Sequence, residues 1–335
     1  MDFSFFLDPG INAAAQNISP LVTSFFVQGV VADTVLWYLI IISVVYLGLH
    51  PKFGVRLAVL LGLCSGLDAA LKLVFHLPRP YWVSSAVTAY QTIGSFGFPS
   101  GGAMNAVAMY GYICVVAKRW WIILLCIFCA VWVTLARLFA GVHFLGDILG
   151  GLLIGLVLLV LYLAAMPEIE KFARTLSRPL RITGIIAISA IPLILVFPAY
   201  LALADWQLPA AWVVMAKSQT GAGINPVSFE LSLLISGTML GSLLGYEFLN
   251  FCGGWDPPQD LLKRVIVVIA GTLSVLLVST AVPAIFAGTG FSALLPQVSD
   301  ILSTSLVYFW LAACVPLIIK KGGSWKSTKN ADTTE

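Results

Sequence analysis

The chain has 335 residues, of which 60% are hydrophobic and 10% are charged, and its formal net charge is +3. Soluble globular domains contain about 45–50% apolar and about 25% charged residues, so this composition excludes a soluble fold. The small positive charge excludes a strongly basic surface, and we expect no nucleic-acid binding.

Apolar stretches of roughly 20 residues, the length of a transmembrane helix, recur along the chain. We therefore predict an all-α fold, a polytopic membrane helical bundle of about nine transmembrane helices. The third and fourth spans are short, and only Lys118 and Arg119 separate them. The predicted spans are residues 33–49, 54–76, 103–117, 120–139, 147–166, 182–203, 229–252, 265–288 and 299–319.

A polar stretch at residues 167–181 divides the predicted bundle and is expected to be a cytoplasmic linker. Residues 33–166 before it form the predicted catalytic core, because they hold all the promising polar motifs. Residues 182–320 form an additional four-helix membrane region. Residues 1–32 lack the basic start of a signal peptide and are predicted to be an interfacial segment. Residues 321–335 form a predicted cytoplasmic tail.

Three glycines in the additional membrane region, Gly237, Gly241 and Gly245, recur at four-residue spacing. This spacing clears one face of a helix for the close approach of another helix. We expect these glycines to serve packing, either within the chain or between copies of it.

The distribution of basic residues predicts the orientation of the bundle. Fourteen of the 18 Lys and Arg residues fall on one side of the predicted spans, leaving Lys72, Arg79, Arg137 and Lys217 for the other side. By the positive-inside rule the first side is the cytoplasm, so the N-terminus lies outside and the C-terminus inside. The other side would face the periplasm from a bacterial inner membrane, or the endoplasmic reticulum lumen in a eukaryote.

A first polar motif lies at the end of the second span. Charged groups inside a membrane cost several kcal/mol unless they are paired or hydrated, so they are functional candidates. Asp68 and Lys72 lie one helical turn apart and can pair. Pro78 and Pro80 stop the helix on either side of Arg79, which can present several donors to an anion.

A second motif opens the third span with Pro99, Ser100 and Gly101. A turn of small residues at the start of a helix exposes backbone N–H groups that suit a phosphate. Ser100 can either cap the helix or donate its hydroxyl to the anion.

A third motif lies between the fourth and fifth spans and contains Arg137, His143 and Asp147. His143 and Asp147 are four residues apart, so a helix beginning here puts the carboxylate within reach of the imidazole. A carboxylate that holds one ring nitrogen leaves the other free to attack. The predicted orientation puts all three motifs on the outer face, where they could converge on one tetrahedral anion and catalyse phosphoryl transfer.

The patterns Lys-x6-Arg-Pro, Pro-Ser-Gly and Arg-x5-His-x3-Asp together resemble the signature of the type-2 phosphatidic acid phosphatase superfamily, which includes membrane lipid phosphatases and glucose-6-phosphatase. The resemblance covers residues 72–147. It implies that His143 is the nucleophile that forms a phosphohistidine and that Asp147 orients it, with no metal or cofactor required. It also implies a phosphate-binding set: Lys72, Arg79, Ser100, the amide of Gly101, and Arg137.

Two positions depart from the family pattern. Ala136 stands where the family has Ser, and Gly102 stands where the family has a His that acts as general acid. General acid catalysis contributes about 10²–10⁴-fold, so activity is expected to be impaired. The chain is an engineered, inactivated variant, a natural protein with weak activity, or an enzyme for a diphosphate whose leaving group needs less protonation. We prefer the first explanation because the other motif residues are intact. His76 is a conceivable substitute, although packing explains it better.

These motifs predict an enzyme that hydrolyses a lipid phosphate, either a monoester or a diphosphate, presented by the bilayer. One alternative is a phosphatase for a soluble sugar phosphate. Another is a catalytically silent protein that binds or transports lipid phosphates, an alternative that Gly102 supports.

Overall fold

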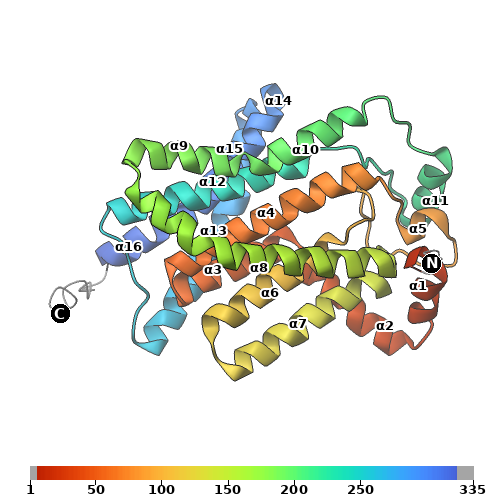
Figure 1. Cartoon of the computed structure of the whole chain (residues 1–335), viewed down its shortest axis with the longest axis horizontal. Helices are drawn as coiled ribbons and strands as arrows, with labels where there is room; N and C mark the ends of the chain where they lie inside the picture. Colours follow the sequence, from red (N-terminus) through yellow and green to blue (C-terminus); the bar gives the residue numbers. More distant parts are fainter. Residues whose placement is uncertain (1–5, 323–335) are drawn as a thin grey trace. The chain divides into compact units, whose positions relative to one another are not determined.

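A computed structural model describes residues 6–322, and every regular element in this range is a helix (Figure 1). The all-α prediction is therefore confirmed. The first five residues of the predicted interfacial segment and residues 323–335 of the predicted tail lie outside the described range. The chain forms two compact units, and the first consists of Met1–Tyr38, Leu60–Arg181 and Ala190–Leu233.

Seven helical segments are long and apolar enough to cross a membrane, and an eighth span results if the bent pair Pro20–Asp33 and Val35–Gly48 is counted as one. The chain is thus a multi-pass integral membrane protein. The apolar helix Gly101–Ala117 has 17 residues and is shorter than each of these seven segments. The number nine and the sidedness stay predictions. The seven segments are Pro51–Val83, Trp120–Phe139, Leu145–Thr175, Arg178–Ala202, Glu230–Phe251, Leu261–Gly288 and Pro296–Lys321.

The first unit begins with short helices that pack against α7 (Trp120–Phe139). Trp132 of α7 donates its indole N–H to the carbonyl oxygen of Phe25 at 2.9 Å. Phe26 stacks on Phe139, with ring centroids 4.6 Å apart. Through these contacts the short helices lie along α7, whose last turn contains Arg137. The short helices are α1 (Pro9–Gln16), α2 (Pro20–Val27) and the 3-10 helix η2 (Gln28–Asp33), and α3 (Val35–Gly48) follows them.

The centre of the first unit is α6 (Gly101–Ala117), which packs against both α7 and α8 (Leu145–Thr175). Lys118 ends α6 in the left-handed conformation at φ 51, so the Lys118–Arg119 pair forms a tight turn into α7. Gly151 of α8 lies against the start of α6, because a Cβ there would come within 2.5 Å of the Ser100 carbonyl oxygen. This close approach sets Asp147 beside the second motif.

Two further features of the chain differ from the predicted spans. α8 continues through Pro167 to Thr175, so part of the predicted linker is helical. The predicted span 182–203 is interrupted at Ala190. The remaining helices that contribute to this unit are α4 (Pro51–Phe75), α5 (Pro80–Val83), α9 (Arg178–Ser189), α10 (Ile191–Ala202) and α11 (Ala210–Thr220).

The second unit consists of Leu39–Val59, Ile182–Ser189 and Leu234–Glu335. Its predicted glycine face is confirmed as packing within the chain. A Cβ at Gly237 would come within 2.6 Å of the Ile301 carbonyl oxygen, and one at Gly245 within 2.7 Å of the Ala312 side chain. This unit contains parts of α3, α4 and α9. Its further helices are α12 (Glu230–Phe251), α13 (Leu261–Gly288), α14 (Phe291–Leu294), α15 (Pro296–Phe309), the π-helix η3 (Trp310–Cys314) and α16 (Val315–Gly322).

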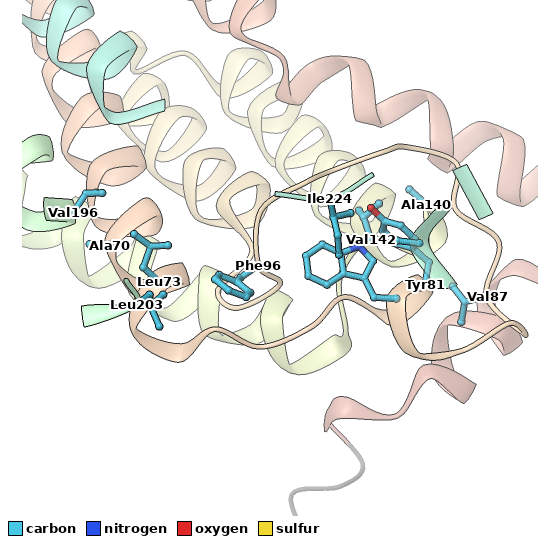
Figure 2. Packing of buried hydrophobic residues seen from close by; sticks show 12 residues of the cluster. Ala70, Leu73, Tyr81, Val87, Phe96, Ala140, Val142, Val196, Leu203 and Ile224 are labelled. Carbon is cyan, nitrogen blue, oxygen red and sulfur yellow. The ribbon is translucent and has the colours of Figure 1, made fainter. Parts of the chain in front are cut away.

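A hydrophobic cluster in the first unit holds the loops that carry the motifs (Figure 2). Tyr81 and Val142 are fully buried in it, next in sequence to the first and third motifs. The Tyr81 hydroxyl donates to the Ile93 carbonyl oxygen at 2.8 Å and accepts from the Ile93 N–H at 3.1 Å. Phe96 lies in the same cluster. Burial of these side chains therefore anchors both ends of the loop between α5 and α6.

Candidate active site

The three motifs meet around His143, which lies between α7 and α8. Its Nε2 atom is 3.2 Å from Nη1 of Arg79, which joins the first and third motifs. The backbone N–H of Ser100 donates to the carbonyl oxygen of Asp147 at 2.9 Å, which joins the second and third motifs. The side chains of all four residues are buried.

All five N–H groups of Arg79 have partners. Nε donates to the Ser95 carbonyl oxygen at 2.6 Å, and Nη2 donates to the Ser95 hydroxyl at 3.0 Å and the Phe96 carbonyl oxygen at 2.9 Å. Nη1 donates to the Val142 carbonyl oxygen at 2.8 Å and faces His143. Three of these donors are held by the loop between α5 and α6 and one by Val142, between α7 and α8. The guanidinium is therefore fixed in place, and an incoming anion would replace the contact with His143.

The partners of the His143 ring determine its tautomer. A guanidinium only donates hydrogen bonds, so Nε2, which faces Arg79, carries the lone pair. The proton of the neutral ring is then on Nδ1, which lies 3.4 Å from Oδ2 of Asp147. The two atoms do not form a hydrogen bond at this distance, and Nδ1 has no other hydrogen-bond partner. Asp147 Oδ2 is itself held by the backbone N–H of Phe144 at 2.9 Å.

The surroundings of His143 also determine its protonation state. Burial lowers the pKa of His143 well below its ordinary value, and the charges of Arg79, Lys72 and Arg137 lower it further. The ring is therefore neutral near pH 7, with the Nε2 lone pair available.

Lys72 forms the predicted pair with Asp68. Its Nζ lies 2.5 Å from Asp68 Oδ1 and donates to the Pro99 carbonyl oxygen at 3.0 Å. The second contact joins the first and second motifs. The Asp68 carboxylate also lies against the start of α6, because a Cβ at Gly101 would come within 2.6 Å of Asp68 Oδ2. The Asp68 carboxylate thus neutralises the lysine charge locally.

Ser100 caps α6. Its hydroxyl oxygen accepts from the backbone N–H of Ala103 at 3.5 Å, and the residue is fully buried. The sequence left two roles open for Ser100, as a helix cap or as a hydroxyl donor to the anion, and this contact supports the helix cap.

Arg137 has an acidic partner that the sequence analysis missed. Its Nη1 atom lies 3.0 Å from Oδ2 of Asp33, at the end of η2. It also donates to Gln91 Oε1 and to the Val30 carbonyl oxygen, both at 3.3 Å, while its Nε has no partner. The position of Asp33 at the edge of an apolar stretch could have indicated a functional acidic residue. In the prediction from the sequence, however, Asp33 was only the first residue of the first span.

Gly102 lies at this ion pair. A Cβ at Gly102 would come within 2.6 Å of Asp33 Oδ2 and within 3.0 Å of Cδ and Nε of Arg137. The carboxylate therefore occupies the space that a side chain at position 102 would enter.

The first helix holds the loop that carries His143. Asn12, which is fully buried, donates to the carbonyl oxygens of Leu138 and His143, both at 2.9 Å. Gln16 donates to the carbonyl oxygen of Phe139 at 2.9 Å. Residues that were predicted to be interfacial therefore position the third motif.

His76 packs among aromatic rings. Its ring centroid lies 5.9 Å from that of Trp206 and 6.2 Å from that of Phe96. These contacts support the packing interpretation and offer no argument for His76 as the proton donor.

Sequence comparison identifies the family. The profile of the PAP2 superfamily matches residues 53–171, which include all the motif residues, and the profile described as PAP2 superfamily phosphatase, transmembrane extension matches residues 233–327. The chain belongs to the PAP2 superfamily. The resemblance drawn from the three motifs is therefore confirmed, and the last helices correspond to the transmembrane extension of these phosphatases.

One solved structure with a detectable likeness is that of a transmembrane PAP2 type phosphatidylglycerolphosphate phosphatase from Bacillus subtilis. It is 23% identical over 53% of this chain and 90% of that chain, with a TM-score of 0.41. No curated protein matches the chain.

Proposed function

We propose that this PAP2 phosphatase hydrolyses a lipid phosphate through a phosphohistidine on Nε2 of His143. The observation that carries the proposal is the arrangement of the imidazole, with Nε2 at Arg79 and Nδ1 at Asp147. A membrane-embedded chain with such a site supports a substrate that already resides in the bilayer.

The reaction has two steps. In the first, Nε2 of His143 attacks phosphorus, the bond to the leaving oxygen breaks, and that oxygen takes up a proton. In the second, water attacks the phosphohistidine, the P–N bond breaks, and inorganic phosphate leaves. Asp147 stabilises the Nδ1 proton as positive charge develops on the ring. Lys72, Arg79 and Arg137 stabilise the charge on the phosphoryl oxygens, so that no metal ion is required.

The distribution of basic residues supports a site on the extracytoplasmic side. In a bacterial inner membrane the site would face the periplasm, and in a eukaryotic cell the endoplasmic reticulum lumen. Residues 33–166 are the proposed catalytic core, and residues 182–320 are an added membrane region.

The proposal is tested by phosphate release from purified protein in lipid nanodiscs. The panel contains a long-chain lipid monophosphate, a polyprenyl diphosphate and glucose 6-phosphate. We expect release from at least one lipid substrate and little from the sugar phosphate. Preference for the sugar phosphate would instead support the soluble-substrate alternative. The matched control is His143→Gln, for which no release is expected.

A second candidate function follows from Gly102. Without the family's histidine the scaffold could bind lipid phosphates without turning them over. Saturable binding of the lipid phosphate with neither phosphate release nor a covalent adduct would favour this silent binding or transport protein.

A further inference from the structure

Gly102 and Asp33 form a complementary pair in the first unit. Gly102 stands where the superfamily signature places a histidine, and an added Cβ would come within 2.6 Å of Asp33 Oδ2. A carboxyl group from the N-terminal segment thus occupies the position of the missing side chain. Unlike the glycine, this group can carry a proton.

The contacts of Asp33 put it among the groups that face the phosphate site. Its Oδ2 lies 3.0 Å from Nη1 of Arg137, and its side chain is 16% exposed. The hydroxyl of Tyr38 donates to Oδ1, so each oxygen of the carboxyl group has its own partner. Asp33 also interacts electrostatically with Lys72 and Asp68. It therefore belongs to the same cluster of charges as the cations around His143.

We propose that Asp33 is the proton donor to the leaving oxygen, in place of the histidine that position 102 lacks. This inference rests on the proposed function. Asp33 adds a catalytic residue from outside the three motifs, and it gives Gly102 a role, which is to leave space for the carboxyl group.

The proton balance of the reaction is as follows. As the bond between Nε2 of His143 and phosphorus forms, the bond to the leaving oxygen breaks and that oxygen takes the proton from the Asp33 carboxyl group. Asp33 is left as a carboxylate. In the second step it accepts a proton from the attacking water, whose oxygen bonds to phosphorus while the P–N bond breaks. Asp33 then passes this proton to the departing phosphate and returns to its carboxylate form, and His143 is neutral.

Arg137 connects substrate binding to the state of Asp33. The Arg137 guanidinium pairs with the Asp33 carboxylate. A phosphate that binds Arg137 competes with Asp33 for this donor, and the carboxyl group then lies beside the phosphate. Asp33 takes its proton from the monoanionic phosphate as that phosphate gives it up. Asp33 therefore holds the proton that it donates only when substrate is bound.

The test compares two leaving groups on one variant. Asp33→Asn keeps the shape of the side chain and removes the acid. For a lipid monophosphate, whose leaving alkoxide needs a proton, we expect kcat to fall about 10²–10⁴-fold. For p-nitrophenyl phosphate, whose leaving group needs little protonation, we expect a loss below about tenfold. Both rates come from the same preparation, so misfolded protein cancels from their ratio.

Two further variants complete the experiment. Asp8→Asn makes the same change at an exposed helix cap of the N-terminal segment, where the amide oxygen can still accept from Gly10, and should leave both rates unchanged. In the Asp33→Ala background, Gly102→His should restore lipid monophosphate hydrolysis, because it returns a proton donor to the same space.

Equal losses on the two substrates, or no loss on either, would overturn the role of Asp33 while leaving the phosphatase function intact. Failure of the unsubstituted protein to release phosphate from either substrate would instead refute the proposed function, and the role of Asp33 with it.

Discussion

The side-chain amide of Asn12 donates to the backbone carbonyl oxygen of His143 at 2.9 Å, across 131 residues of sequence. The same amide holds the carbonyl oxygen of Leu138. The first helix is therefore part of the support of the proposed nucleophile.

Replacement of Asn12 by Ala should lower both stability and activity. It removes the side-chain donor of the buried His143 carbonyl oxygen, and an unsatisfied buried group costs about 1–3 kcal/mol. The Leu138 carbonyl oxygen still accepts from the backbone N–H of Gly141 at 3.1 Å. Thermal unfolding and phosphate release from the same preparation measure the two effects. Gln16→Ala is the matched comparison, because Gln16 also bridges backbone carbonyls but is more exposed. An Asn12→Ala protein as stable and active as the Gln16→Ala protein would contradict this role.

A methyl group at Gly151 should disturb the site from a distance. Its Cβ would come within 2.5 Å of the Ser100 carbonyl oxygen, so α6 and α8 would have to move apart. We expect Gly151→Ala to lower the unfolding temperature and the rate together. Gly184→Ala is the control, since a Cβ there meets nothing within 4 Å and alanine favours a helix by about 1 kcal/mol. Equal tolerance of the two substitutions would refute the close approach.

Asp147→Asn should reduce kcat with little change in KM. An amide can donate to Nδ1 of His143, which would favour the tautomer whose Nε2 carries the proton and cannot attack. We expect a loss of at least about 100-fold in kcat, measured by steady-state kinetics on the lipid substrate. Asp147→Glu, which keeps the charge, should retain more activity. An unchanged kcat for Asp147→Asn would show that the carboxylate does not control the ring.

The depressed pKa of His143 predicts the acid side of the pH profile. The attacking form is the neutral ring, so kcat/KM should stay high as the pH falls through about 6.5, the ordinary value for histidine, and decline only below it. The linked effect on stability has the same sign. Below about pH 6.5 the unfolded chain binds a proton that the folded chain does not, so the free energy of unfolding should decrease as the pH falls.

Both His143 and the substrate phosphate can titrate. Rates measured on substrates whose phosphates have different pKa values separate these two contributions to the pH profile. A limb that belongs to His143 stays in place from one substrate to the next. An acid limb centred at or above pH 6.5 on every substrate would contradict the assignment.

The sequence predicted the helical fold and the clustering of the motif residues for definite physical reasons. Long apolar stretches have few alternatives to a membrane helix. Intramembrane charges such as Lys72 and Arg137 require partners, so they pointed to a site. The i, i+4 spacing of Asp68 and Lys72 was enough to predict their contact, because it is local.

The contribution of the N-terminal segment could not be predicted in the same way. The contacts of Asn12 and Asp33 with the third motif each join residues more than 100 positions apart in the sequence. The periodicity of the sequence carries no information about such long-range contacts. The motif pattern identified the gap at Gly102 but could not show which side chain fills it. The lengths of α6 and of the bent pair before α4 also depend on packing that composition does not express.

The proposed reaction depends on a covalent intermediate on His143. Purified protein is mixed with ³²P-labelled lipid phosphate, quenched in alkali, where a phosphohistidine survives, and digested for peptide mapping. We predict label on the peptide that contains His143, its loss on brief acid treatment, and no label in the His143→Gln protein. Phosphate release without label on His143, or label that persists in His143→Gln, would contradict the account.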